Sequence, residues 1–316
     1  MAYLFVSMSL IFLTLKGFLG KKTSIFVGNT GDAVLFTLMR MLICIPIGLI
    51  PIAIDNAWSF LALDGGMAAI CLLVGAANAV YISSWILAIR HCTMVTMDVM
   101  LTIGSIIPAV LCHVLDWERL RIPKVLGFLV VILATVILAG GGKTVRKKKS
   151  FWVILLPILS AVGEGTVSFS QQLYKHYYSS ADALAGVEYP QSIYHFYTYV
   201  IASVFLIAFF AVYQCITVSK MKAEGALDRT PCLAPLKKTF WFIAMMAACM
   251  FIAAYFQTEA TSSYGMSSQV MYPLIKAGSL VLNALVAQLF FGERITRRRV
   301  IGVIVALVGI VVMNVF

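Results

Sequence analysis

The chain has 316 residues, of which 61% are hydrophobic and only 12% are charged, and its formal net charge is +11 at pH 7. The charged share is about half that of a soluble globular protein, which excludes an ordinary water-soluble domain. The seven cysteines show neither paired nor metal-ligand spacing, so no disulfide framework and no metal site is expected.

Apolar runs long enough to cross the hydrocarbon core of a bilayer as helices recur along the whole chain. The first run has no basic residue before it and no small-residue cleavage site, so we interpret it as a span and not as a signal peptide. The predicted spans are 2–20, 34–54, 67–89, 94–114 and 123–142, followed by 151–173, 192–216, 239–260, 265–291 and 298–316. We therefore predict an all-α polytopic membrane protein with ten transmembrane helices.

Two parts of the chain resemble each other at an offset of 175 residues: Glu118-Arg119-Leu120 with Gly127, and Glu293-Arg294-Ile295 with Gly302. Each part would contain five spans, an odd number, so the two copies must cross the membrane in opposite directions. Inverted repeats of this kind are typical of transporters. The predicted boundaries are 1–142 for the first five-helix repeat, 143–150 for a basic linker and 151–316 for the second five-helix repeat.

The basic linker has two interpretations. Basic peptides can bind nucleic acid, but between two apolar spans such a cluster is more typical of an orientation signal. Lys and Arg counted over the loops favour both termini outside the cell. This asymmetry explains the net charge without an acidic partner such as nucleic acid.

Polar side chains recur at helical spacing inside several predicted spans. In 151–173, Ser160, Glu164, Ser168 and Gln171 are spaced 4, 4 and 3 residues apart, which puts them on one helical face. Comparable stripes are Gln269, Tyr272, Lys276, Ser279 and Asn283; Asn78, Tyr81 and Trp85; Asp98, Thr102 and Ser105; and Tyr255, Glu259 and Ser262. Because polar groups are costly in lipid, we expect these faces to converge on a polar cavity along the bundle axis.

Glu164 and Lys276 lie near the middle of their spans. In a functional interpretation, Glu164 carries a proton or binds a cation, and Lys276 binds a carboxylate or phosphate. In a structural interpretation, the two form a buried ion pair that needs no ligand. A pair that opens to receive a charged substrate would combine both.

Other charged and aromatic residues lie closer to the predicted span ends. For Lys16, Arg40 and Asp98, a solvated or interfacial charge is the commoner role, whereas Glu259 fits either role equally. The aromatic residues in 189–199 fit a recognition wall or an interfacial belt, and the belt is the commoner arrangement.

No catalytic constellation is present. The histidines, His91, His113, His176 and His195, form no H-x-x-x-H pair and have no carboxylate at catalytic spacing, and the chain has no phosphate loop. We expect no enzyme activity, no catalytic residues and no cofactor. The expected partners are a small-molecule substrate, protons as a candidate coupling ion, and the lipid bilayer.

The chain resembles the drug/metabolite transporter superfamily, in particular its ten-span EamA-type branch, over essentially all its length. The residues that carry the resemblance are Phe291-Gly292-Glu293-Arg294 with Gly302 and Gly309, Trp117-Glu118-Arg119 with Gly127, Arg40, Ala88-Ile89-Arg90-His91, and the exit Ser170-Gln171-Gln172-Leu173-Tyr174-Lys175. These motifs are moderately specific to the superfamily and carry almost no information on the substrate.

The resemblance implies secondary transport by alternating access around a central site lined by the first, third, fourth, sixth, eighth and ninth spans. It implies a structural role for Glu118 and Glu293. The helix of Glu164 also resembles the first helix of small multidrug transporters, but the matching region, Leu10–Leu13, is apolar, which argues against two-carboxylate drug antiport. Ten-span relatives usually keep both termini in the cytoplasm, against the loop charges, so both orientations stay open.

We therefore expect a multi-pass carrier of the inner or plasma membrane that moves a small polar or amphiphilic metabolite, such as an amino acid or drug-like amine, more often outward. The alternatives are a passive channel or facilitator and a non-transporting scaffold or receptor. Gly163 and Gly165 fit helix packing within the bundle or between chains, which leaves the oligomeric state open. The candidate pathway residues are Glu164, Lys276, Gln171, Ser168, Tyr272, Asn283, Asn78, Tyr81, Trp85, Asp98 and Glu259.

Overall fold

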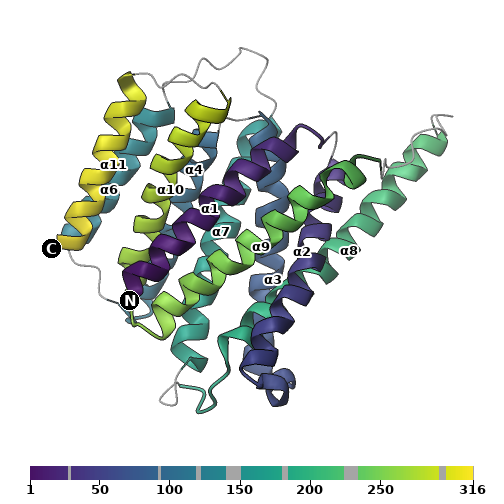
Figure 1. Cartoon of the computed structure of the whole chain (residues 1–316), viewed down its shortest axis with the longest axis horizontal. Helices are drawn as coiled ribbons and strands as arrows, with labels where there is room; N and C mark the ends of the chain where they lie inside the picture. Colours follow the sequence, from purple (N-terminus) through teal and green to yellow (C-terminus); the bar gives the residue numbers. More distant parts are fainter. Residues whose placement is uncertain are drawn as a thin grey trace.

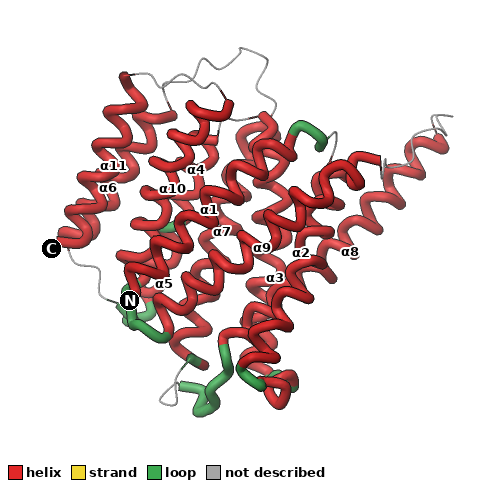
Figure 2. The backbone as a smooth tube through the Cα atoms, viewed as in Figure 1, coloured by secondary structure: helices red, strands yellow, loops and turns green. Residues whose placement is uncertain are grey.

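The computed structural model describes residues 1–27, 30–91, 94–118, 122–139, 151–179, 184–223, 234–291 and 297–315. Within these ranges the chain is helical, with turns and loops but no strand (Figure 2). The helices are α1 (Ala2–Ser24), α2 (Thr30–Ile54), the short 3-10 helix η1 (Ala57–Leu61), α3 (Gly65–His91), α4 (Met94–Gly104), α5 (Ile106–Val114), α6 (Ile122–Ala139), α7 (Phe151–Tyr178), α8 (Gln191–Ala223), α9 (Ala234–Ser262), α10 (Ser268–Phe291) and α11 (Arg297–Val315).

The predicted span 94–114 is broken at Ser105 into α4 and α5, which the sequence interpretation did not foresee. Pro108 explains the break, because proline lacks the N–H that would bond to the carbonyl of Gly104 four residues earlier. Every other predicted span coincides with a single helix, and several helices extend a few residues beyond the predicted ends.

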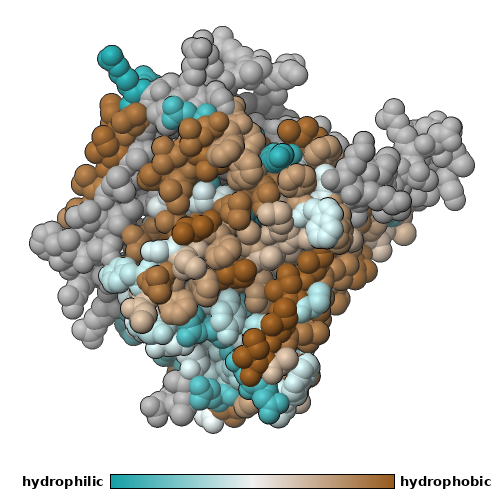
Figure 3. Space-filling view, viewed as in Figure 1, coloured by the Kyte–Doolittle hydropathy of each residue, from teal (hydrophilic) through white to brown (hydrophobic). Residues whose placement is uncertain are grey.

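Six helices of the described chain are long and apolar enough to cross a membrane: α1, α2, α3, α8, α9 and α10. Large hydrophobic side chains are exposed along the middle of α8, among them Val204, Phe205 and Val212. Hydrophobic residues cover much of the face in Figure 3, and hydrophilic residues gather toward its lower end. Lipid tails would cover such a surface favourably, whereas water would not, so the chain has the features of a polytopic membrane protein.

Helices distant in sequence pack side by side in the bundle (Figure 1). α6 lies along α11, α1 along α9, α3 along α7 and α2 along α8, and α3 also contacts α8. α4 and α5 contact α7, and α4 and α1 contact α10. The most extensive contacts each join a helix before residue 140 to one after residue 150. α1 begins and α11 ends at the same end of the bundle.

Three glycines let α7 approach its neighbours closely. A Cβ on Gly165 would lie 2.5 Å from the carbonyl oxygen of Gly104, and one on Gly163 would lie 3.0 Å from the backbone of Tyr81. A Cβ on Gly104 would in turn collide with the carbonyl of Ala161. These glycines therefore pack helices within the chain, which was one of the two roles predicted for Gly163 and Gly165. They bring α3 and α4 to the two sides of Glu164.

Tyrosines of the second part of the chain hold the segment between α2 and α3 at one end of the bundle. The hydroxyl of Tyr178 donates to Asp64 Oδ2 at 2.7 Å, and Tyr197 donates to the carbonyl of Leu61 at 2.6 Å. Tyr189 donates to the carbonyl of Ala62 at 3.1 Å and accepts a hydrogen bond from the backbone N–H of Asp64. At this end, polar contacts therefore join segments that are distant in the sequence.

Candidate functional site

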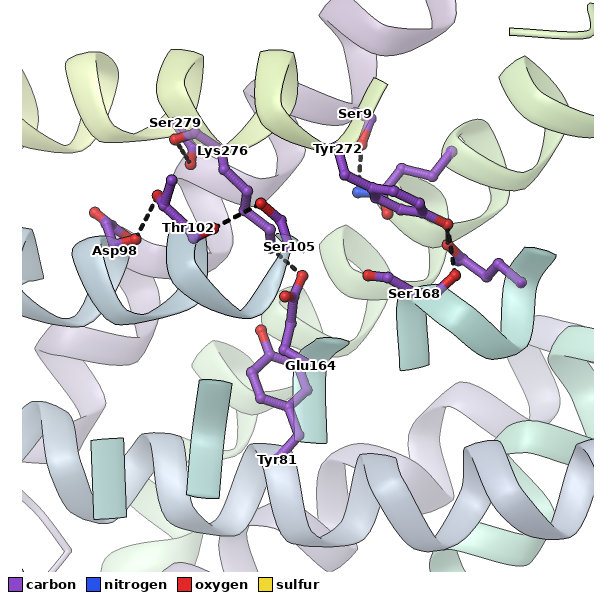
Figure 4. A network of polar contacts seen from close by, with 12 residues as sticks. Ser9, Tyr81, Asp98, Thr102, Ser105, Glu164, Ser168, Tyr272, Lys276 and Ser279 are labelled. Atoms are coloured by element: carbon purple, nitrogen blue, oxygen red, sulfur yellow. Dashed lines mark hydrogen bonds and ion pairs between the residues drawn. The ribbon is translucent and has the colours of Figure 1, made fainter. Parts of the chain in front are cut away.

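Glu164 on α7 and Lys276 on α10 form a buried ion pair between Glu164 Oε1 and Lys276 Nζ (Figure 4). The contact is the one that the structural interpretation of these residues describes, and the functional interpretation stays a prediction. The second carboxylate oxygen of Glu164, Oε2, is buried and accepts no hydrogen bond from the described residues. The pair is thus satisfied on one side only, which leaves an open acceptor in the bundle interior.

Two small cavities adjoin this pair. The first, of about 60 Å³, is lined by residues of α1, α3, α7, α8, α9 and α10. The second, of about 30 Å³, is lined by residues of α1, α3, α4 and α10. The two share Leu13, Lys16, Tyr81 and Lys276, so they form one polar region around the ion pair. The resemblance implies a site lined by the first, third, fourth, sixth, eighth and ninth spans, which correspond to α1, α3, α4–α5, α7, α9 and α10. Residues of all six line the cavities, and α8, the seventh span, lines the first cavity as well.

Nine of the eleven candidate pathway residues line these cavities. Those at the first cavity are Asn78, Tyr81, Glu164, Ser168, Gln171 and Lys276. Those at the second are Tyr81, Trp85, Asp98, Lys276 and Asn283. Tyr272 and Glu259 line neither.

Tyr272 lies behind the wall of the first cavity and fastens α10 to α7. Its hydroxyl lies 2.8 Å from the carbonyl oxygen of Ser168 and 2.8 Å from Gln171 Oε1, and it accepts a hydrogen bond from Gln172 Nε2 at 3.2 Å. Tyr272 is fully buried, so these contacts satisfy a hydroxyl that would otherwise be costly. Tyr272 therefore supports the side chain of Gln171, which lines the first cavity.

Asp98 is held at the second cavity by a hydrogen bond between helices. Asn283 Nδ2 on α10 donates to Asp98 Oδ2 on α4 at 2.9 Å. Glu259, in contrast, accepts a hydrogen bond from Gln191 Nε2 and lies outside both cavities. Asp98 therefore lies at a cavity that adjoins the ion pair, whereas Glu259 does not.

The interfacial interpretation of Lys16 and Arg40 is wrong, because these side chains are only 8% and 2% exposed. Lys16 borders both cavities, and its Nζ lies 5.5 Å from the ring centre of Tyr81 and 5.9 Å from that of Trp85. Sequence reasoning missed Lys16 as a site residue. The available signal was that Lys16 is the only charged residue before Lys21.

The belt interpretation is also wrong for three of the aromatic residues in 189–199. Tyr194, His195 and Tyr199 are buried and line the first cavity. His195 Nε2 lies 3.0 Å from the hydroxyl of Thr258, so the ring is held by a hydrogen bond to α9. These three aromatic side chains therefore form part of the cavity wall, and their role in recognition stays a prediction.

The corner residue Glu118 contacts the start of α10. Its Oε2 accepts a hydrogen bond from Ser267 at 2.9 Å, and its carbonyl accepts one from Gln269 Nε2 at 3.2 Å. Glu293 and the basic linker 143–150 lie outside the described residues. Within the part of the chain that is described, no group of three His, Cys, Asp or Glu side chains could hold a metal ion.

The comparisons with known proteins establish the fold and nothing further. No protein-family model matches the sequence, and no curated protein matches it. A solved structure described only as "Crystal structure of protein" is similar, with a TM-score of 0.67 and 14% identity over 99% of this chain and 96% of that chain. The fold is therefore shared over nearly the full length of both chains.

Proposed function

We propose that this protein is a secondary-active transporter of a small polar or amphiphilic metabolite and exports its substrate across the inner or plasma membrane. The observation that carries the proposal is the half-satisfied Glu164–Lys276 pair beside cavities built from both parts of the chain. Ionisable groups inside a membrane bundle are costly and mark substrate or ion pathways. In this proposal all ten predicted spans cross the bilayer, as in the EamA-type branch that the sequence resembles.

The pattern of helix contacts supports two inverted repeats. In two such repeats, the counterparts of α1, α2, α3, α4–α5 and α6 would be, in that order, α7, α8, α9, α10 and α11. Each of the following contacts then has an equivalent contact, in which both helices are replaced by their counterparts. The α1–α9 contact matches α7–α3, α2–α9 matches α8–α3, and α1–α10 matches α7–α4. The contacts α2–α8, α4–α10 and α6–α11 each match themselves. A pseudo-two-fold axis between the repeats would generate this pattern.

The size of the cavities supports alternating access. A volume of about 60 Å³ holds a few water molecules, whereas small-molecule sites measure about 300–1,000 Å³. A substrate thus requires the two repeats to move apart around the ion pair. Binding must favour the two access states differently, since equal affinity for both shifts no population. In this mechanism Glu164 exchanges Lys276 for a proton or a charged substrate group as the cavity opens.

The test is transport by the purified full chain in vesicles with an imposed pH gradient, probed with L-phenylalanine, L-threonine and ethidium. We predict that Glu164→Gln abolishes pH-driven movement per folded protein, because the amide cannot exchange a proton. The matched control is Glu259→Gln, which changes a carboxylate outside both cavities and should retain transport. Unchanged pH dependence in Glu164→Gln would exclude the proton role.

Two further measurements separate the other classes of protein. A passive channel would give flux that neither saturates nor shows counterflow. A sealed scaffold would protect cysteines placed at Ser168 and Ser279, on the cavity walls, from a water-soluble thiol reagent. Labelling at both positions together with counterflow is the result that the transporter proposal requires.

A further inference from the structure

Lys16 is a buried cation that borders both cavities and has no carboxylate of the described residues within ion-pair distance. Its Nζ makes one long hydrogen bond, 3.4 Å to the hydroxyl of Tyr81, and lies over the rings of Tyr81 and Trp85. An ammonium group has three N–H donors, so Lys16 keeps donors for another partner. Removing such a group from water is unfavourable unless a counter-charge compensates it.

The carboxylates near Lys16 are already engaged. Glu164 pairs with Lys276, and Asp98 accepts a hydrogen bond from Asn283. Arg40 is a further cation near Lys16, and two of its guanidinium nitrogens are buried without a hydrogen-bond partner among the described residues. With Arg40, which lies near Lys16 but lines neither cavity, three cations stand against two carboxylates in this region. Of the three, Lys16 is the one that borders the cavities without an ion pair to a described carboxylate.

We propose that Lys16 binds a carboxylate of the transported molecule, which makes the substrate a small carboxylate; this rests on the transport function proposed above. The ammonium supplies a charge-assisted hydrogen bond, the Tyr81 hydroxyl supplies a second polar contact, and the rings of Tyr81 and Trp85 pack on the rest of the molecule. Glu164 and Asp98 border the same cavities and would repel a dianion, so a monocarboxylate fits better than a phosphate ester.

The proposal is tested by thermal shift of the detergent-purified full chain. The probes are L-alanine, L-threonine, L-phenylalanine, lactate and phenylacetate, each compared with its own carboxamide. A ligand that binds only the folded state raises the melting temperature, and the dose dependence gives its affinity. We expect at least one acid to bind and its amide to bind at least 10-fold more weakly.

Variants at Lys16 assign the effect to this residue. Lys16→Met should weaken binding of the acid at least 10-fold, and Lys16→Arg, which keeps the charge, should retain most of it. Lys22→Met is the matched control, because Lys22 lies on the same helix but is exposed and lines neither cavity. If Lys16→Met does not yield monodisperse protein, the test uses the native chain and Lys16→Arg. The affinity of each for the acid is then compared with its affinity for the amide, and this comparison decides the proposal.

Three results would overturn the proposal: no acid binds the native chain, acid and amide bind equally, or Lys16→Met binds the acid as tightly as the native chain does. If the vesicles nevertheless transport ethidium, the transport function stands and only the carboxylate assignment fails. If acids bind through Lys16 but no probe crosses the membrane, the anion site stands and the transport function fails.

Discussion

The two carboxylate oxygens of Glu164 have different surroundings, and this asymmetry is central to the site. Oε1 meets Lys276 Nζ, whereas Oε2 is buried without a hydrogen-bond partner among the described residues. Desolvating two charges is costly, so a buried pair is weak evidence for stability. Removing one member is worse, because the other charge stays in a low-dielectric interior.

The stability of single and double variants therefore reports on the pair. We predict that Lys276→Met lowers the free energy of unfolding by about 3–5 kcal/mol, and that adding Glu164→Gln recovers much of the loss, because no unpaired charge then remains. Chemical unfolding of the detergent-purified variants measures both values. A cost for Lys276→Met as small as that of the exposed Lys22→Met would show that the pair is not coupled.

Packing between helices places Glu164 where it is. Gly163 and Gly165 flank it on α7 and admit the backbones of α3 and α4, and Gly104, next to the break at Ser105, lies opposite Gly165. Away from Glu164, three tyrosine hydroxyls, those of Tyr178, Tyr189 and Tyr197, donate hydrogen bonds to the segment 61–64. These bonds connect α7, α8 and the loop between them to the segment just before α3. If the bundle opens at that end in the proposed transport cycle, these hydrogen bonds must break.

A methyl group at the glycine contact tests this packing. We predict that Gly165→Ala costs about 1–3 kcal/mol, since the added Cβ would lie 2.5 Å from the Gly104 carbonyl oxygen and 2.6 Å from Ile107 Cδ1, and a backbone carbonyl yields little. Gly65→Ala is the control, because a Cβ there meets nothing within 4 Å. Equal melting temperatures for the two variants would contradict the close contact.

Across the whole molecule, the most extensive helix contacts join the part before residue 140 to the part after residue 150. α6 packs on α11, α1 on α9, α3 on α7 and α2 on α8. Each part alone would expose these faces, including the polar side chains that line the cavities. The two parts are therefore expected to depend on each other for their fold, although each corresponds to one predicted repeat.

Co-expression of the two parts as separate chains tests this dependence. We predict that 1–142 and 151–316 co-purify as one complex with a single melting transition, whereas either part expressed alone gives aggregated protein. The reason is that the buried polar faces of one part find their partners only in the other. Two separately stable, monodisperse parts would show that the contacts across the bundle are secondary.

The sequence alone determined the positions of nearly all the helices, and it offered Lys276 as the candidate partner of Glu164. Apolar runs of spanning length can satisfy their backbone only as helices, and two opposite charges deep in such runs are best satisfied by each other. The lengths and polar spacings are local properties, so they are visible without a fold. Pro108 was visible too, although the break that it causes at Ser105 was not predicted.

Only the tertiary structure decided the burial of Lys16, Arg40, Tyr194, His195 and Tyr199. Each lies within a few residues of the end of a predicted span, where exposure is the commoner state, and each is buried because other helices pack over it. Tyr272 and Glu259 belong to equally regular polar stripes, yet one supports Gln171 and the other bonds Gln191 outside the cavities. Burial at a given position depends on which distant helix covers it, and helical periodicity in one segment does not contain that information.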